Sequence, residues 1–558
     1  MNWSSRLNRF IQQPRLSVLA VLLLLLTGIT HALADAETPE IPAPMFFLQQ
    51  IKPVLIDGSY REKGEAIAVI AMQDRKLALR LLTAMLNTDL FYDESKQSLY
   101  EIKSADQGYQ ISALTDDGVF TNAIPAASQS GYKKIRINNS LRSQLRQAIA
   151  SLQLQDNDPA VRLGAVDEML KKLDDDALQQ IAMFRQQEKN ADVQALMEVA
   201  LAVGALQSGD DNKAEAAIYT LGDSLQPVAL NTLRQFAEDS ESTKLKKAAQ
   251  DAIKHIEGKQ RFFEKLETLY FGLSFGSVLV LAGIGLAITF GVMGVINMAH
   301  GELIMIGAYT TFVIQQMLPG LIELSIIIAI PAAFLVSAMV GILMERLVIR
   351  HLYGRPLETL LATFGISLIL QQAVRSIFSP LNRSVVTPQW MSGMLEINSI
   401  FSITWNRLYI IVFSLAVFFA LLLVMKKSSL GLHVRAVSQN RNMARAMGVR
   451  SERVDILTFG LGSGIAGIAG VALSLLTNVG PNLGQAYIID SFIVVVFGGV
   501  GNLFGTLLAG MSLGVANKFM EPWAGAVLAK ILLLVFIILF IQKRPQGLFP
   551  QRGRAAEN

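Results

Sequence analysis

Apolar residues are distributed unevenly along the 558-residue chain, which is polar in its first half and apolar in its second. Residues 35–265 contain no apolar run of the roughly 20 residues that a helix needs to cross a bilayer. Beyond residue 265 the apolar segments follow one another closely. They are 269–292, 302–318, 324–349, 357–378, 406–425, 455–477, 486–500, 503–520 and 524–542. This pattern predicts an all-α polytopic membrane protein with about 8–10 transmembrane or re-entrant helices, preceded by a soluble domain.

The pattern changes once within the polar half. Residues 90–92, 99–102 and 109–114 are typical of short strands, because turn-forming residues separate them. From residue 141 to residue 256, apolar residues recur at spacings of three and four, as on amphipathic helices. We therefore predict a mostly α-helical soluble domain with a few short strands.

Two helix starts within this domain are alike. Asp158 precedes Pro159, and proline suits the first turn of a helix. Asn190 begins a similar sequence segment about one repeat length later. The second half of the domain is thus predicted to be HEAT-like, with two or three stacked helical hairpins; a plain helical bundle is the alternative. The acidic run at 174–176 is interpreted as a solvated helix end instead of a cation site.

The first 34 residues have the features of a secretory signal peptide. Three arginines precede an apolar run at residues 16–26, and Ala32 and Ala34 follow it. Residues 1–34 are therefore predicted to be a signal peptide and residues 35–265 an exported, periplasmic domain. An uncleaved anchor is the alternative, and it places the domain on the same side. The chain contains no cysteine, so this domain depends on its packed core and not on disulfides.

Basic residues indicate the orientation of the membrane domain, residues 266–545. They gather at 346–355, at 426–453 and after residue 543, and basic loops prefer the cytoplasm. We therefore predict a cytoplasmic loop at 426–455 and a cytoplasmic tail at 546–558. The composition agrees, because 52% hydrophobic and 17% charged residues indicate a membrane part and a soluble part. A net charge of +4 does not suggest a nucleic-acid partner.

The apolar segments are interrupted by polar residues at 291–307, GVMGVINMAHGELIMIG. Asn297, His300 and Glu302 interrupt the apolar run, and a lipid-facing helix would not carry such groups at this depth. Polar groups at a broken helix are how transporters line a substrate path. The alternative is a short cytoplasmic turn between two helices.

A second glycine-rich interruption, at residues 497–510, also contains an asparagine and is a candidate equivalent position of an internal repeat. Thr363 and Ser367 carry hydroxyls one turn apart on a predicted helix between the two interruptions. The further candidate path residues are Thr363, Ser367, Gly499, Gly501 and Asn502. Helix packing alone would explain each glycine, and hydroxyls also bond back to their own helix.

Two charges lie within apolar segments. Asp490 and Lys530 each need a partner or water, because an unpaired charge in a bilayer costs several kcal/mol. We predict that they pair with one another; the alternative for Lys530 is that its side chain extends to the membrane surface.

The basic loop at 426–455 contains a predicted amphipathic helix. Asn440 or Ser438 caps it, Gly448 ends it, Ala444 lies on its apolar face, and two arginines lie one turn apart on another face. Such a helix suits docking into a groove of a cytoplasmic partner; a solvated positive loop is the alternative. The candidate coupling residues are Arg435, Arg441, Ala444, Arg445 and Gly448.

Four sequence segments in this half resemble those of a known family. GLHVRAVSQNRNMARAMGV resembles the cytoplasmic coupling loop of permease subunits in the branched-chain amino acid uptake family of ABC transporters. INMAHGELIMIGAY, TLLATFGISLILQ and FGGVGNLFGTLLAG resemble other parts of the same subunits, in the same order. The long exported domain resembles that of the urea-type permease subunit of this family.

The resemblance implies an importer in the bacterial inner membrane. Its partners would be a second permease, two cytoplasmic ATPase subunits and a periplasmic solute-binding protein. The chain has no G-x-x-x-x-G-K-[ST] phosphate loop and no hydrolytic triad or metal-ligand spacing, so we expect neither catalysis nor a cofactor. Urea is the expected solute, with branched-chain amino acids or short amides as alternatives. A membrane-anchored sensor, a scaffold or a passive channel would leave the coupling loop without a purpose.

Overall fold

The computed structural model describes residues 43–93, 98–105, 108–115, 118–208 and 210–549. The predicted signal peptide and nearly all of the predicted tail lie outside these ranges. The chain forms two compact units, one ending at Ile256 and the other beginning at Glu257. Both this division and the predicted boundary at residue 265 fall within one helix, α12 (Thr243–Met293). The change in composition is therefore not a break in secondary structure.

The described part of the first unit starts with three helices, of which the latter two are capped by polar side chains. The helices are α3 (Ala43–Asp57), α4 (Tyr60–Ala71) and α5 (Arg75–Leu86). Ser59 and Glu62 form a capping box at α4, and Asp74 accepts hydrogen bonds from the first turn of α5. Leu55, Ile70 and other buried residues of these helices make one core with the sheet that follows.

A five-stranded antiparallel sheet follows, in the order β4-β3-β2-β1-β5. Its strands are β1 (Leu90–Asp93), β2 (Ser98–Ala105), β3 (Gly108–Ala113), β4 (Ile124–Ala126) and β5 (Lys133–Lys134). The three predicted strands are confirmed as β1 to β3. The sequence pattern missed β4 and β5 because three and two residues are too few to show an alternation.

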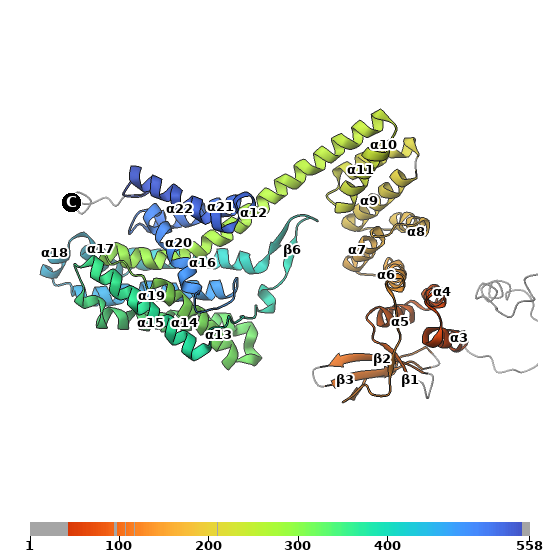
Figure 1. The fold of residues 1–558 in the computed structure, drawn as a ribbon, viewed down its shortest axis with the longest axis horizontal. Helices are drawn as coiled ribbons and strands as arrows, with labels where there is room; N and C mark the ends of the chain where they lie inside the picture. The colour runs from red at the N-terminus through yellow and green to blue at the C-terminus, as the bar shows by residue number, and fades with distance from the viewer. Residues whose placement is uncertain (1–42, 94–97, 106–107, 116–117, 209, 550–558) are drawn as a thin grey trace, which may run out of the picture. The chain divides into compact units, whose positions relative to one another are not determined.

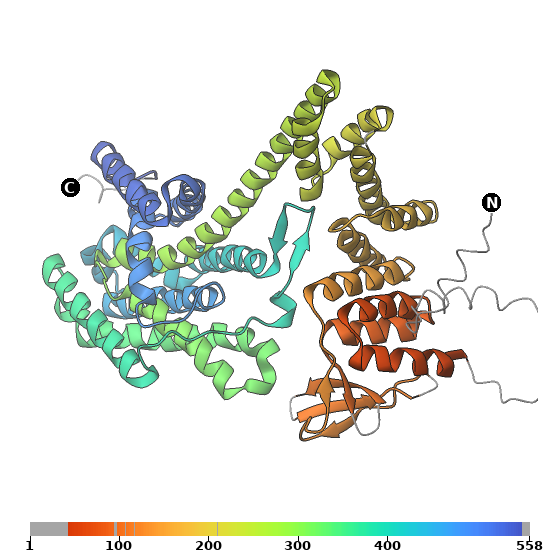
Figure 2. The ribbon, with the colours of Figure 1, turned by 45° about the vertical axis from the view of Figure 1, so that its right-hand side comes forward.

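Six helices then follow one another along this unit (Figures 1 and 2). They are α6 (Asn139–Gln153), α7 (Pro159–Leu170), α8 (Asp175–Arg185), α9 (Ala191–Gln207), α10 (Asp211–Asp223) and α11 (Pro227–Asp239). Asp158 and Asn190 cap α7 and α9 as the sequence predicted. Asp174 caps α8, so the acidic run is a helix start; in the described part of the chain no cluster of three acidic or histidine ligands occurs.

A buried carboxylate takes part in an ion pair within this helical part. Arg162 donates from Nε and Nη2 to the two carboxylate oxygens of Glu188, each at 2.7 Å, and joins α7 to the loop between α8 and α9. The Glu188 side chain is only 4% exposed. The hydrogen bonds from Arg162 hold the pKa of Glu188 at about 2, well below its usual range.

A folded-state pKa of about 2 makes the stabilisation by Glu188 depend on pH. The stabilisation is complete above the unfolded pKa, about 4.3, and is lost as the pH falls towards 2. We expect Glu188→Gln to increase hydrogen exchange across α7 and α9 at pH 7, with native and variant chains converging near pH 2. Mass spectrometry of the full-length chain at matched pH values measures this. A difference that stayed constant down to pH 2 would contradict the assignment.

In the second unit, all nine predicted apolar segments are helices. They are α12, α13 (His300–Met317), α14 (Ile322–Leu347), α15 (Pro356–Phe378), α16 (Trp405–Lys427), α19 (Ser451–Ser474), α20 (Leu483–Gly498), α21 (Leu503–Ala524) and α22 (Ala526–Lys543). Among the described residues, seven helices are long and apolar enough to cross a membrane. The others are α13 and α20, the helices next to the two predicted interruptions. The fold is thus a polytopic helical membrane domain, as predicted.

Short elements connect these helices. The short 3₁₀ turns are η1 (Pro319–Leu321), η2 (Ile349–His351) and η3 (Gln389–Met391), and a small hairpin is formed by β6 (Met394–Glu396) and β7 (Ser402–Thr404). The predicted cytoplasmic loop folds into two helices, α17 (Ser429–Gln439) and α18 (Arg441–Ala446).

The helix α19 is almost completely buried, and its glycines allow close packing. A Cβ atom on Gly307 of α13 would overlap the backbone of Gly467, and one on Gly470 would overlap the carbonyl oxygen of Ile304. Gly462 of α19 similarly approaches the backbone of Gly285 in α12. Small residues of this kind let membrane helices approach backbone to backbone. The position of α13 is therefore set by α19.

Candidate functional site

The first predicted interruption separates α12 from α13. The turn contains Gly294, whose φ of +65° favours glycine. Asn297 Oδ1 accepts a hydrogen bond of 3.0 Å from the backbone N–H of Ala299, and His300 Nε2 lies 2.9 Å from the carbonyl oxygen of Ala282 in α12. Because a carbonyl only accepts, Nε2 carries the imidazole proton. Both side chains are buried, so they face protein and not lipid.

Glu302 lies in the first turn of α13 and contacts α15. Its Oε1 atom accepts hydrogen bonds from Ser367 Oγ at 3.0 Å and from Gln371 Nε2 at 2.7 Å. Ser367 and Gln371 lie near the middle of the 23-residue helix α15. Since α15 is one of the long apolar helices, this places the Glu302 carboxylate near the middle of the membrane domain.

A stripe of buried polar residues on α15 faces this interruption. Its members recur at intervals of four residues: Thr359, Thr363, Ser367 and Gln371. Thr363 Oγ1 accepts a hydrogen bond of 3.2 Å from the backbone N–H of Met298, inside the turn between α12 and α13. The sequence analysis named Thr363 and Ser367 but missed Thr359 and Gln371. Extending the four-residue spacing of Thr363 and Ser367 by four residues in each direction would have identified Thr359 and Gln371.

Three buried polar atoms of this cluster have no hydrogen-bond partner among the described residues. They are Glu302 Oε2, Asn297 Nδ2 and His300 Nδ1. A buried polar group left unpaired costs about 1–3 kcal/mol, so such groups need an explanation. They are a carboxylate acceptor, an amide donor and an unprotonated ring nitrogen, each with unused hydrogen-bonding capacity. His300 contacts α12 and Glu302 contacts α15, so these two groups face different helices.

The second predicted interruption is arranged differently. Asn502 caps α21, because its Oδ1 accepts from the N–H of Gly505 at 3.1 Å, and its Nδ2 donates to the carbonyl oxygen of Phe549 at 3.4 Å. Gly499 and Gly501 have φ values of +102° and +78°. A Cβ atom on Gly291 of α12 would overlap Gly501, so the two interruptions touch through glycines.

The polar groups of the two interruptions are not brought together. The N–H of Leu548 donates to the carbonyl oxygen of Phe497 at 2.9 Å, so residues 548 and 549 run against the end of α20. The Asn502 side chain is used by its own helix and by this segment. Within the part of the chain that the structure describes, no hydrogen bond joins Asn502 to the Glu302 cluster. Asn502 therefore serves as a helix cap, and the contact between the two interruptions is made by Gly291 and Gly501.

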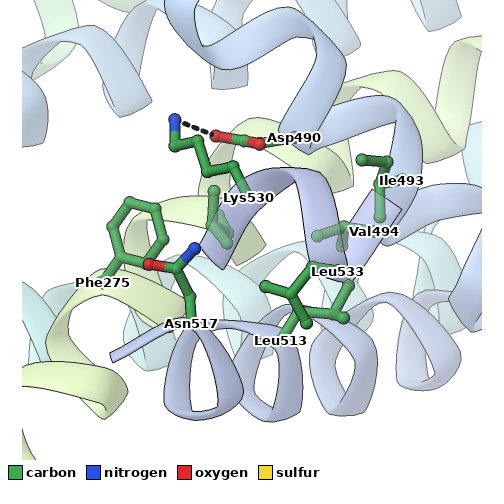
Figure 3. Close-up of a pocket in the computed structure, with 9 residues that line it drawn as sticks. Phe275, Asp490, Ile493, Val494, Leu513, Asn517, Lys530 and Leu533 are labelled. Atoms are coloured by element: carbon green, nitrogen blue, oxygen red, sulfur yellow. Dashed lines mark hydrogen bonds and ion pairs between the residues drawn. The ribbon is translucent and has the colours of Figure 1, made fainter. Parts of the chain in front are cut away.

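The two intramembrane charges lie side by side. Lys530 Nζ in α22 donates to Asp490 Oδ2 in α20 at 3.0 Å, and the two side chains point toward one another in Figure 3. They border a cavity of about 20 Å³, enough for roughly one water, that Phe275 and Asn517 also line. The geometry is that of the predicted pair, and the Lys530 side chain remains 45% exposed.

Exchanging these two charges tests the pair. We expect Asp490→Lys or Lys530→Asp alone to lower the amount of folded permease in membranes, because each leaves two like charges facing one another. The double exchange should restore most of the lost protein. Quantitative immunoblotting of detergent-soluble, monodisperse chain measures this. A double variant no more abundant than either single variant would disprove the pairing.

The predicted coupling loop is partly as expected. Asn440 caps α18, Gly448 follows it with φ +89°, and Ala444 packs with Val434 and other apolar residues of this region. Arg435 donates to the carbonyl oxygen of Met425 at the end of α16. The most exposed apolar side chains of the loop belong to Met443 and Met447, at 62% and 78%.

The two arginines of α18, predicted as coupling residues, both contact the start of α19. Arg441 makes two hydrogen bonds of 2.8 Å to the Asp455 carboxylate, and Arg445 Nε donates to Ser451 Oγ at 2.7 Å. Asp455 and Ser451 are buried in the first turns of α19. The Arg441 guanidinium thus contacts a buried carboxylate of α19, whereas Arg445 bonds to Ser451 and remains exposed. The sequence analysis missed Asp455 and Ser451, although their spacing of four matches that of the arginines.

Comparison with known proteins agrees with this architecture. Residues 268–541 match the model of the family described as branched-chain amino acid transport system / permease component. The chain is similar to the high-affinity branched-chain amino acid transport system permease protein BraD of Pseudomonas aeruginosa, at 31% identity over 295 residues, 51% of this chain and 96% of that protein.

Two further relatives carry related names. The permease protein LivH of Escherichia coli is 29% identical over 300 residues, 52% of this chain and 96% of LivH. LivM of Salmonella typhimurium is 24% identical over 297 residues, 49% of this chain and 68% of LivM. No solved structure matches. The matched relatives align with about half of this chain, and the family model begins at residue 268. The chain is a member of the branched-chain amino acid permease family of transport proteins.

Proposed function

We propose that this chain is the permease subunit of an ATP-driven importer in the bacterial inner membrane, and that its solute is urea. It forms the translocation path with a second permease. Two cytoplasmic ATPase subunits bind near α18, and a periplasmic solute-binding protein delivers the solute. The similarity to both LivH and LivM supports a path built from two unlike but related permeases. The domain at 35–265 then faces the periplasm and helps to receive the binding protein.

The observation that carries this proposal is the buried cluster around Glu302. Its Oε2 acceptor and the Asn297 amide donor have no partners among the described residues. Urea offers amide N–H donors to the first and a carbonyl acceptor to the second. The surrounding groups, Ser367 and Gln371, are neutral, which suits a neutral solute. A path of this kind replaces the hydration of the solute without a strongly charged lining.

A branched-chain amino acid is the second candidate. The names of the relatives favour it, and a substrate ammonium group would complement the Glu302 carboxylate. An amino acid would also need a cationic or N–H partner for its own carboxylate. Arg375, one turn beyond Gln371 on α15, is the nearest arginine along that helix and contacts Asn482 at 2.8 Å.

Uptake measurements distinguish these solutes. Cells with and without this chain are supplied with labelled urea and labelled leucine, with and without ATP depletion. Loss of urea uptake alone supports the urea proposal, and loss of leucine uptake alone replaces urea by an amino acid. If purification of the chain brings down no separate ATPase subunit, the importer proposal itself is wrong.

A further inference from the structure

Two parallel contacts attach the short helix α18 to the start of α19. Arg441 of α18 contacts Asp455 of α19. Four residues further along α18, Arg445 contacts Ser451, which lies four residues before Asp455 in α19. We call these four residues the clamp. Because the two contacts lie one helical turn apart on both helices, they fix the direction of α18 as well as its position.

The first contact of the clamp extends to the turn between α14 and α15. The Arg441 guanidinium lies 5.0 Å from the ring centre of Tyr353, and the Tyr353 hydroxyl donates to Glu345 Oε1 at 3.3 Å. Burial, followed by the charges of Asp455 and Glu345, raises the pKa of Tyr353, so its hydroxyl stays protonated and keeps donating. The guanidinium is thus held on one side by a carboxylate and on another by an aromatic ring.

The clamp resists separation of the two helices. Asp455 is 1% exposed and Glu345 is 2% exposed. If α18 moved away while α19 stayed in place, the buried Asp455 charge would lose its bidentate partner. Removing one partner of a buried pair is strongly unfavourable, so the two helices are expected to move together.

The helix α19 then contacts the candidate substrate site through backbone. Gly467 lies against Gly307, and Gly470 lies against the carbonyl oxygen of Ile304, within the first two turns of α13. Glu302 is two residues before Ile304. Such contacts leave little room for sliding, because a packed interface has discrete arrangements and is not continuously deformable. A displacement of α19 therefore displaces the turn that carries Glu302.

We propose that the clamp, Arg441 with Asp455 and Arg445 with Ser451, is the positioning element that transmits movement of α18 through α19 to the Glu302 site. This inference rests on the proposed function, since α18 is the proposed contact for the ATPase subunits. It assigns to Arg441 and Arg445 the role of holding α18 to α19. The exposed apolar side chains available to contact the partner are Met443 of α18 and Met447, directly after it.

The first test measures coupling in the complete complex, reconstituted into liposomes with its ATPase subunits. Asp455→Asn keeps the shape of the side chain and removes its charge. We expect the solute moved per ATP hydrolysed to fall roughly tenfold, within the range that changes along a coupling network produce. The matched control is Glu452→Gln, which removes an exposed carboxylate from the same helical turn and should leave the ratio unchanged. An unchanged ratio in Asp455→Asn overturns the proposal.

A rescue experiment distinguishes the loss of this positioning contact from a general loss of structure. The double variant Arg441→Asp with Asp455→Arg reverses the ion pair, and we expect it to recover part of the coupling ratio that each single change loses. A double variant as uncoupled as the single ones, with assembly intact, would show that the pair does not transmit the movement.

The second test does not depend on transport. The chain has no cysteine, so Ala362→Cys, next to Thr363 on α15, gives a single reporter thiol. We expect nucleotide binding to change its reaction rate with a small thiol reagent, and Asp455→Asn to abolish that change. A change that persists in Asp455→Asn overturns the clamp. Absence of urea and leucine uptake by the unmodified complex overturns only the proposed solutes, because the thiol measurement still reports transmission.

Discussion

Replacement of Glu302 by alanine is expected to reduce ATP-dependent uptake roughly tenfold or more, because it leaves Ser367 and Gln371 without their shared acceptor. Each buried polar group left unpaired costs about 1–3 kcal/mol, and about 1.4 kcal/mol corresponds to a tenfold change. The variant also removes Oε2, the unpaired acceptor that the proposed solute would contact. Initial uptake rates, divided by the amount of permease in the membrane, measure the effect.

Two further variants separate charge from hydrogen bonding. Glu302→Gln keeps one acceptor oxygen for Gln371 but removes the charge, so we expect a smaller loss than with alanine if the solute is neutral. A substrate ammonium would make the glutamine variant nearly as inactive as the alanine variant. Glu358→Gln is the matched control, since this exposed glutamate lies at the start of α15. Full uptake by the alanine variant would remove Glu302 from the path.

Replacement of Gly307 by valine is expected to prevent the membrane domain from folding normally. A Cβ atom at this position overlaps the backbone of Gly467, and a backbone cannot change rotamer to make room. Overpacking a side chain in a well-packed core typically costs about 1–3 kcal/mol, and a clash with backbone should reach or exceed that range. We expect a large fall in monodisperse permease on size-exclusion chromatography and a lower thermal midpoint.

The control for this prediction is another glycine within a membrane helix. Gly365 of α15 has no atom within 4 Å of the position where a Cβ would lie. Gly365→Val should therefore yield close to the normal amount of folded protein. Equal losses in the two variants would attribute the effect to helix propensity, and not to the contact between α13 and α19.

Local patterns were sufficient for most of the fold. The runs of apolar residues marked the nine membrane-domain helices, and the caps at Asp158 and Asn190 marked two helix starts. The strands β4 and β5 were not predicted, because their pairing with β3 and β1 depends on residues outside the strands themselves. Likewise, nothing in the composition shows that α12 continues unbroken past residue 265.

The site was predicted only in part, for a different reason. Glu302 stood out as a charge in an apolar segment, but Gln371 lies 69 residues away, and helix pairing is not encoded in either segment alone. The two arginines of α18 were predicted as coupling residues, but their acceptors in α19 could not be named, because these appeared as ordinary residues at the start of the next apolar segment. A spacing of four identifies a helix face, but it does not tell which neighbour covers that face.

The close contact between Gly301 and Gly484 has an electrostatic consequence. These glycines are the second residues of α13 and α20, and a Cβ on either would overlap the backbone of the other. Two helices therefore begin at one point, and the positive ends of their macrodipoles meet beside Glu302. The backbone itself thus helps to balance a carboxylate deep in the membrane domain. Exchanging the polar side chains around Glu302 can therefore alter solute preference while the two helix dipoles still stabilise the carboxylate.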